Sequence, residues 1–192
     1  MEKKVILLNG PSSSGKSTLA RELSSLIRKR YGLDYPVISI DDHMKLPADE
    51  TIYEDDVWEI EPDIRGAVCS ALERADGAVT DHVITSARIY EDFMQLEDTA
   101  PVLKVRVTCP LDVLLAREKS RGDRAAGSAQ ASYEYLYPRD GYDLTVDTSV
   151  MPAEECAEII LTEAEKLKDR NIRRRQDFIN GDKESQGLQI RY

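Results

Sequence analysis

Residues 5–18 read VILLNGPSSSGKST and carry the strongest structural signal in the chain. Its first four residues are apolar, a run of the length that a short buried strand requires. The part that follows, Gly10–Ser17, satisfies the pattern G-x-x-x-x-G-K-[ST] of a phosphate-binding loop. Apolar residues at helical spacing come next and predict a helix over Gly15–Arg30, with Gly32 as its C-terminal cap. Strand, loop and helix in this order are the context in which the motif holds a nucleoside triphosphate.

The residue types of the motif explain how such a loop works. Glycine permits positive φ angles, so backbone N–H groups can turn inward around phosphate oxygens, and the N-terminus of the following helix adds partial positive charge. We expect Lys16 to bridge the outer phosphates of ATP and the Ser17 hydroxyl to bind Mg²⁺; a Gly/Ser-rich turn that binds nothing is the alternative. The expected nucleotide contacts are Gly10, Pro11, Ser12, Ser13, Ser14, Gly15, Lys16, Ser17 and Thr18.

Short apolar runs alternate with longer segments of helical spacing along the rest of the chain. This order indicates β-α-β crossovers and a mostly parallel sheet covered on both faces. Pro110 and Pro152 each stand where they can open a helix. We therefore predict a three-layer α/β/α fold with about five parallel strands. The expected strands are Val5–Leu8, Val37–Ile40, Ala78–Ile84, Val102–Cys109 and Tyr142–Val146.

The composition is that of one soluble globular domain, with 192 residues, 41% of them hydrophobic and 32% charged. Acidic residues outnumber basic ones by 36 to 26, which gives a net charge of −10 and disfavours nucleic acid and anionic membranes as partners. The three cysteines are far apart and fit neither a zinc site nor a disulfide framework. No targeting segment or membrane span is visible. We expect a cytoplasmic protein that acts on a small molecule, and the sequence leaves its oligomeric state open.

The periodic pattern ends before the chain does. It predicts a domain over residues 1–167 and a polar tail over residues 168–192. The tail contains a basic cluster, Arg170–Arg175. We interpret this cluster as a solvated helix end rather than as a contact for RNA or a partner protein.

The sequence lacks the features of two other classes of P-loop protein. Switch GTPases need an N/T-K-x-D motif after a strand, which is missing, and the D-x-x-G match at Asp63–Gly66 follows Pro62 rather than a strand. Motor ATPases need a longer chain. Small kinases remain, in which a helical lid brings arginines over the phosphates.

Three arginines stand in a candidate lid at about residues 117–139. Arg117, Arg121 and Arg124 precede a Gly/Ala-rich stretch that suits a hinge, and all three are candidate nucleotide contacts. We expect Arg121 and Arg124 to neutralise charge that develops on the transferred phosphoryl group. A solvated, charged helix end is the alternative.

A candidate general base stands at the end of the second expected strand. Asp41 follows Val37–Ile40 directly, at the sheet edge where open α/β folds bind ligands, so it can accept the proton of an attacking hydroxyl. Strand alternation would point Asp42 the opposite way. A structural N-cap role for either aspartate is the alternative, and His43 is expected to be an exposed polar residue rather than a contact for the acceptor.

A second acidic candidate, Asp81, lies in the third expected strand and could hold Mg²⁺ through water. The polar triplet at residues 80–82 interrupts this strand, however, and weakens the assignment. The acidic segment Glu54–Asp63, which includes Trp58, is interpreted as a solvated loop rather than a site for a cationic acceptor. A set of alternating tyrosines is expected to form a short strand that packs the lid, with stacking on adenine or an aromatic acceptor as the alternative. These tyrosines are Tyr133, Tyr135 and Tyr137.

Four stretches together resemble the chloramphenicol phosphotransferase family of small P-loop kinases: ILLNGPSSSGKST, VISIDD, REKSRGDRAAG and YDLTVDTSVMPAEECAEII. The resemblance extends to about Lys166. It implies a fold similar to that of shikimate and nucleotide kinases, and transfer of phosphate from ATP, with Mg²⁺, to a hydroxyl of the antibiotic. It also implies that Asp41 is the catalytic aspartate and that Arg121 and Arg124 are the lid arginines. The segment between Asp41 and Arg65 departs from the family pattern, so the acceptor stays open.

Two alternative functions remain at this point. One is a nucleoside, nucleotide or sugar kinase on the same scaffold. The other is a non-catalytic, nucleotide-binding regulator. A regulator would need neither a strand-end aspartate nor an arginine lid, so the sequence favours an enzyme.

Overall fold

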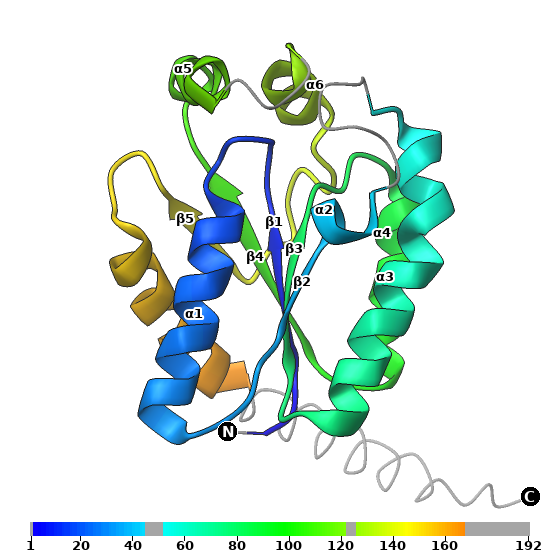
Figure 1. Cartoon of the computed structure of the whole chain (residues 1–192), viewed down its shortest axis with the longest axis vertical. Coiled ribbons are helices and arrows are strands. Elements are labelled where there is room, and N and C mark those ends of the chain that lie inside the picture. Colours follow the sequence, from blue (N-terminus) through cyan, green and yellow to red (C-terminus); the bar gives the residue numbers. More distant parts are fainter. Residues whose placement is uncertain (1, 45–51, 122–125, 168–192) are drawn as a thin grey trace, which may run out of the picture.

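Five parallel strands form the central sheet of the computed structural model, which describes residues 2–44, 52–121 and 126–167. The strands are β1 Val5–Asn9, β2 Val37–Ser39, β3 Ala78–His82, β4 Val102–Thr108 and β5 Leu144–Asp147. They lie in the order β2-β3-β1-β4-β5, so β1 and the loop that follows it are central (Figure 1). The predicted α/β fold is confirmed.

Helices cover both faces of this sheet and one of its ends. They are α1 Lys16–Tyr31, α2 Ile40–His43, α3 Glu54–Arg74, α4 Ala87–Met94, α5 Leu111–Arg121, α6 Ser128–Tyr135 and a helical segment over residues 153–167, with a 3₁₀ turn at Gln95–Asp98. In Figure 1, α1 and the segment over residues 153–167 cover one face, and α3 and α4 cover the other. α5 and α6 lie beyond the carboxyl ends of the strands. No helix within the described ranges is both long and apolar enough to cross a membrane.

The core has two apolar layers because β1 is buried on both faces, as a parallel strand between helix layers must be. Ile6 and Leu8 pack in the layer beneath α1, whereas Val5 and Leu7 pack in the layer beneath α3. All four side chains are fully buried. This central position holds the end of β1, and thus the start of the glycine-rich loop, in a fixed place.

The third strand is continuous through the polar triplet that was expected to interrupt it. Thr80, Asp81 and His82 all belong to β3 and are buried. His82 Nε2 lies 2.9 Å from Glu61 Oε2 of α3, and both side chains are fully buried. A hydrogen-bonded partner across the helix–sheet interface is what allows a polar side chain to lie there.

The expectation of a solvated loop at Glu54–Asp63 is wrong, because these residues form the first half of α3. Three acidic residues occupy the first turn, where they favour a helix through its dipole. Apolar side chains recur at helical spacing and are buried against the sheet. These side chains are Val57, Ile60, Ile64, Val68 and Leu72.

The alternating tyrosines do not form a strand. Tyr133 and Tyr135 lie on α6, and Tyr137 follows it. Tyr133 and Tyr135 are exposed, whereas Tyr137 is partly buried and its ring contacts that of Tyr90. The proposed lid, about residues 117–139, includes the end of α5, all of α6 and the residues that follow it, while Arg124 and the tail over residues 168–192 lie outside the described residues.

Candidate functional site

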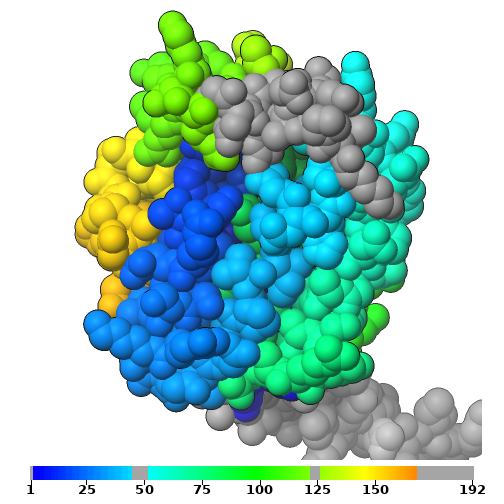
Figure 2. Space-filling model, viewed as in Figure 1, coloured from blue at the N-terminus to red at the C-terminus, as the bar shows by residue number. Residues whose placement is uncertain are grey.

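Two cavities adjoin at the carboxyl ends of the strands. The first, about 550 Å³, is called the P-loop cavity; it is lined by Ser12, Ser13, Gly15, Lys16, Ser17, Thr18, Arg21, Val37, Ser39, Ile40, Asp41, Asp42, Asp81, Val83 and Arg121. The second, about 460 Å³, is called the apolar cavity; it is lined by Ser12, Ile40, Asp41, Met44, Ile52, Tyr53, Glu54, Val57, Val83, Thr85, Ala126, Gly127, Ser128, Ala131, Ser132 and Tyr135. Figure 2 shows the recess between the blue surface of α1 and the cyan surface of α2. Four residues line both cavities: Ser12, Ile40, Asp41 and Val83.

The loop between β1 and α1 has the backbone geometry of a phosphate cradle. Ser13 and Gly15 both have positive φ angles, 64° and 86°, which turn successive N–H groups to one side. Lys16 is only 6% exposed, and its Nζ donates to Pro11 O at 2.8 Å. Two loop hydroxyls, Ser13 Oγ and Ser14 Oγ, are buried without a hydrogen-bond partner among the described residues. Unsatisfied donors beside a buried lysine fit the oxygens of a bound polyphosphate.

Gly10 is required because the loop passes directly against β4. A Cβ atom at this position would lie 2.2 Å from Val107 O, a backbone atom that cannot move independently. We expect Gly10→Ala to lower the free energy of unfolding by about 1–3 kcal/mol, measured by denaturant titration.

The matched control for this change is Gly66→Ala on the exposed side of α3, where an added Cβ meets nothing within 4 Å. Alanine should stabilise that helix by up to about 1 kcal/mol. Equal stability of the two variants would contradict the close contact at Gly10.

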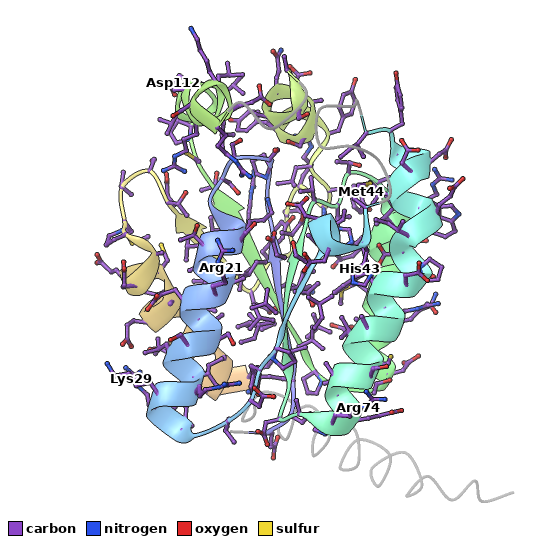
Figure 3. The ribbon with its side chains drawn as sticks, in the orientation of Figure 1. Arg21, Lys29, His43, Met44, Arg74 and Asp112 are labelled. Atoms are coloured by element: carbon purple, nitrogen blue, oxygen red, sulfur yellow. The ribbon has the colours of Figure 1, made fainter. Side chains whose placement is uncertain are left out.

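The second strand ends earlier than expected, which changes the geometry of the two neighbouring aspartates. Residues 40–43 form the short helix α2, so strand alternation does not separate Asp41 from Asp42, and that part of the prediction is wrong. Both aspartates line the P-loop cavity, but only Asp41 also lines the apolar cavity. His43 is half-exposed at the end of α2, beside Met44 (Figure 3).

Asp81 and Ser17 come together at the P-loop cavity, from β3 and α1. Asp81 is 2% exposed and accepts a hydrogen bond from Ser39 Oγ at 3.4 Å. The described residues contain no group of three or more His, Cys, Asp or Glu side chains arranged for a metal ion. A hydroxyl and one carboxylate leave most ligand positions to water and phosphate oxygens, an arrangement that suits Mg²⁺.

The arginines of α5 occupy different positions. Arg121 lines the P-loop cavity. Arg117 donates from Nη2 to Thr148 O at 2.9 Å and from Nη1 to Thr148 Oγ1 at 3.1 Å and Ser13 O at 3.5 Å. Thr148 Oγ1 in turn donates to Ser14 O at 2.7 Å. Arg117 therefore links α5 to the glycine-rich loop and to the loop after β5.

Sequence reasoning missed three residues here: Arg21, Asn9 and Thr148. Arg21 lines the P-loop cavity from α1 (Figure 3), one helical turn after Ser17, and this i,i+4 spacing was the available signal.

Asn9 is fully buried. Its Nδ2 donates to Tyr137 O and Tyr142 Oη, both at 2.8 Å, and its Oδ1 accepts from Ile84 N at 3.0 Å. These contacts join distant segments, so no local pattern announces them.

Tyr142, the phenol bonded by Asn9, stays protonated. Burial raises the pKa of Tyr142 to about 12, and the hydrogen bond from Asn9 opposes this shift only in part. The phenol is therefore neutral at physiological pH. Asn9, the last residue of β1, and Tyr142 thus form an uncharged hydrogen-bonded pair.

The apolar cavity differs in charge from the P-loop cavity. Its described lining contains two carboxylates, Asp41 and Glu54, and no lysine, arginine or histidine. Arg88 Nε donates to Glu54 Oε1 at 2.7 Å, and this hydrogen bond is the main reason that the pKa of Glu54 lies below its usual value. Glu54 therefore stays ionised. This lining suits a ligand with an apolar body and no negative charge.

The sequence model described as chloramphenicol phosphotransferase-like protein matches residues 3–165. No curated protein matches the chain. Three solved structures illustrate the similarity in fold. The APS kinase CysC of Mycobacterium tuberculosis, in complex with AMPPNP and APS, is 20% identical with a TM-score of 0.68, and the match covers 85% of this chain and 98% of that one. A gluconokinase from Sinorhizobium meliloti is 18% identical with a TM-score of 0.65, and the match covers 88% of this chain and 97% of that one. Shikimate kinase from Acinetobacter baumannii is 22% identical with a TM-score of 0.58, and the match covers 88% of this chain and 94% of that one.

Proposed function

Because the chain belongs to the chloramphenicol phosphotransferase-like family, we propose that it transfers the terminal phosphoryl group of ATP to a hydroxyl group of a small molecule. One observation carries this proposal. The carboxylate-bearing residue Asp41 lines both the cavity next to the glycine-rich loop and the apolar cavity beside it. A general base between a phosphate site and an acceptor site is what this reaction requires.

The residues of the P-loop cavity would act on the nucleotide. Backbone N–H groups of the loop and Lys16 would hold the phosphates. Arg121 and Arg124 would neutralise the negative charge on the phosphoryl group during its transfer. Ser17 would bind Mg²⁺ directly and Asp81 through water. When bound, Mg²⁺ supplies positive charge to the phosphate oxygens.

Asp41 would act on the acceptor. It would orient the hydroxyl and accept its proton while the hydroxyl oxygen forms a bond to the terminal phosphorus. The bond from that phosphorus to the oxygen bridging it to the β-phosphate breaks, and ADP leaves. The products are a phosphate monoester and ADP.

The acceptor class follows from the lining of the apolar cavity. We propose an alcohol with an apolar body and no negative charge, and chloramphenicol is the first compound to test because the family is described by that name. The neighbours' acceptors APS, gluconate and shikimate are anions. The described lining offers such compounds no cation, and Asp41 would repel them, whereas the charge of Glu54 is paired with that of Arg88.

An acceptor panel tests both parts of this proposal. We expect ADP release and a phosphorylated product, identified by mass, with an uncharged alcohol that has an apolar body, such as chloramphenicol. APS, gluconate and shikimate at the same concentration should leave ADP release at its basal rate. Preferential turnover of an anion would refute the acceptor class, whereas ATP binding without turnover of any acceptor would favour a non-catalytic regulator.

A further inference from the structure

One residue of α6 contacts the glycine-rich loop at the junction of the two cavities. Ser132 is 8% exposed and lines the apolar cavity. Its Oγ accepts a hydrogen bond from Ser12 N at 2.8 Å. Ser12 lines both cavities, so this bond fixes the part of the loop that separates them.

The direction of this bond is determined by the other contacts of the hydroxyl. Ser132 Oγ donates to Ser128 O at 2.6 Å, with Ala129 O at 3.2 Å, one turn earlier in α6. The single hydroxyl proton is thus used within the helix, which leaves a lone pair for the Ser12 N–H. The Ser12 donor therefore points to α6 and not into the phosphate cradle.

The helix that carries Ser132 is itself held in place. Glu118 of α5 accepts from Ala129 N at 2.7 Å and from Gly127 N at 3.1 Å, so its carboxylate caps the start of α6. Arg117, the preceding residue, anchors α5 to Thr148 and to the glycine-rich loop. Two helices therefore hold the loop by hydrogen bonds. Arg117 of α5 donates to Ser13 O, and Ser132 Oγ of α6 accepts from Ser12 N.

We propose that Ser132 is a positioning residue, which holds the Ser12 amide so that the phosphoryl group and the acceptor hydroxyl keep their alignment across the boundary between the cavities. Its kinetic consequence rests on the proposed function. Ser132 makes no bond to the phosphates. Its loss should therefore affect the transfer step more than nucleotide binding, because small errors in alignment slow a reaction strongly.

The first test uses the kinetics of Ser132→Ala in the full chain. We expect kcat for the best acceptor to fall about tenfold, the equivalent of one lost hydrogen bond, while KM for ATP changes less than about threefold. Ser132→Thr keeps a hydroxyl that can bond to the same helix carbonyl, and it should restore most of kcat.

The matched control is Gln130→Ala. Gln130 is exposed on the same helix and contacts Glu134 at 2.9 Å rather than the loop. It should retain wild-type kcat. An unchanged kcat in Ser132→Ala, or an equal loss in Gln130→Ala, would overturn the proposal.

A second measurement does not depend on turnover. The Ser12 amide should exchange its hydrogen at least about tenfold faster in Ser132→Ala than in the wild type, and it should stay protected in the wild type when a non-hydrolysable ATP analogue is bound. Loss of protection on binding the analogue would show that the bond belongs only to the empty protein, and would overturn the proposal. A wild type that phosphorylates no acceptor of the panel would refute the proposed function, and the exchange rates would still decide whether Ser132 holds the loop.

Discussion

Replacing Lys16 by alanine is expected to abolish phosphoryl transfer, with kcat reduced at least about 10³-fold. Lys16 is the buried cation of the P-loop cavity, 6% exposed and within 2.8 Å of Pro11 O. Its ammonium group would leave this carbonyl for the outer phosphate oxygens. Removing it takes away positive charge where negative charge shifts during transfer, in a site that water screens poorly. Affinity for ATP, measured by calorimetry, should fall as well.

The control for this change lies on the same helix. Lys29 is exposed at the opposite end of α1, far from the cavities (Figure 3). Lys29→Ala removes the same charge from the chain but should leave kcat unchanged. Thermal unfolding of both variants shows whether each is folded. A folded Lys16→Ala protein with wild-type turnover would refute the assignment of this loop as the phosphate site.

The second large effect is expected at the boundary between the cavities. Asp41→Asn should keep ATP affinity within about threefold but lose at least about 10²-fold in kcat, because an amide cannot accept the proton of the attacking hydroxyl. Asparagine preserves the size of the side chain, so the change tests charge and proton transfer rather than packing. The assay is ADP release with the best acceptor of the panel.

Asp42→Asn is the matched control, since both aspartates lie on α2 and line the P-loop cavity. Asp42 does not line the apolar cavity, so its substitution should reduce kcat less than about tenfold. If Asp42→Asn lost more kcat than Asp41→Asn, Asp42 would be assigned as the general base. Full activity in both variants would remove α2 from the mechanism.

Patterns within short segments predicted much of the fold correctly. The apolar runs identified all five strands, and the glycine-rich motif with its following apolar stripe identified α1. The errors have different origins. Residues 80–82 looked like an interruption because polar side chains were read as exposed, whereas the acidic residues of Glu54–Asp63 obscured the apolar stripe of α3. The Glu61–His82 hydrogen bond shows why the first reading failed, since a partner from another element satisfies a buried polar group.

The residues of the candidate site also differ in how far short sequence patterns could predict their positions. Lys16 and Ser17 are close together in the chain, and the structure places both at the P-loop cavity because helix and loop geometry hold them within a few bonds of one another. Asp41 stood out in the sequence as a candidate base, but its place at the boundary of two cavities depends on α2, which no short pattern indicated.

Local chemistry therefore specified the glycine-rich loop, its strand and its helix, because their hydrogen bonds and periodic apolar faces involve neighbours in the chain. The hydrogen bond between Ser12 and Ser132 joins residues 120 positions apart, and the one between Asn9 and Tyr142 joins residues 133 positions apart. Such contacts arise when the sheet brings distant segments to one edge, where the packing of α5, α6 and the loop after β5 sets the distances. The arrangement of the site is consequently a property of the assembled sheet and its helices.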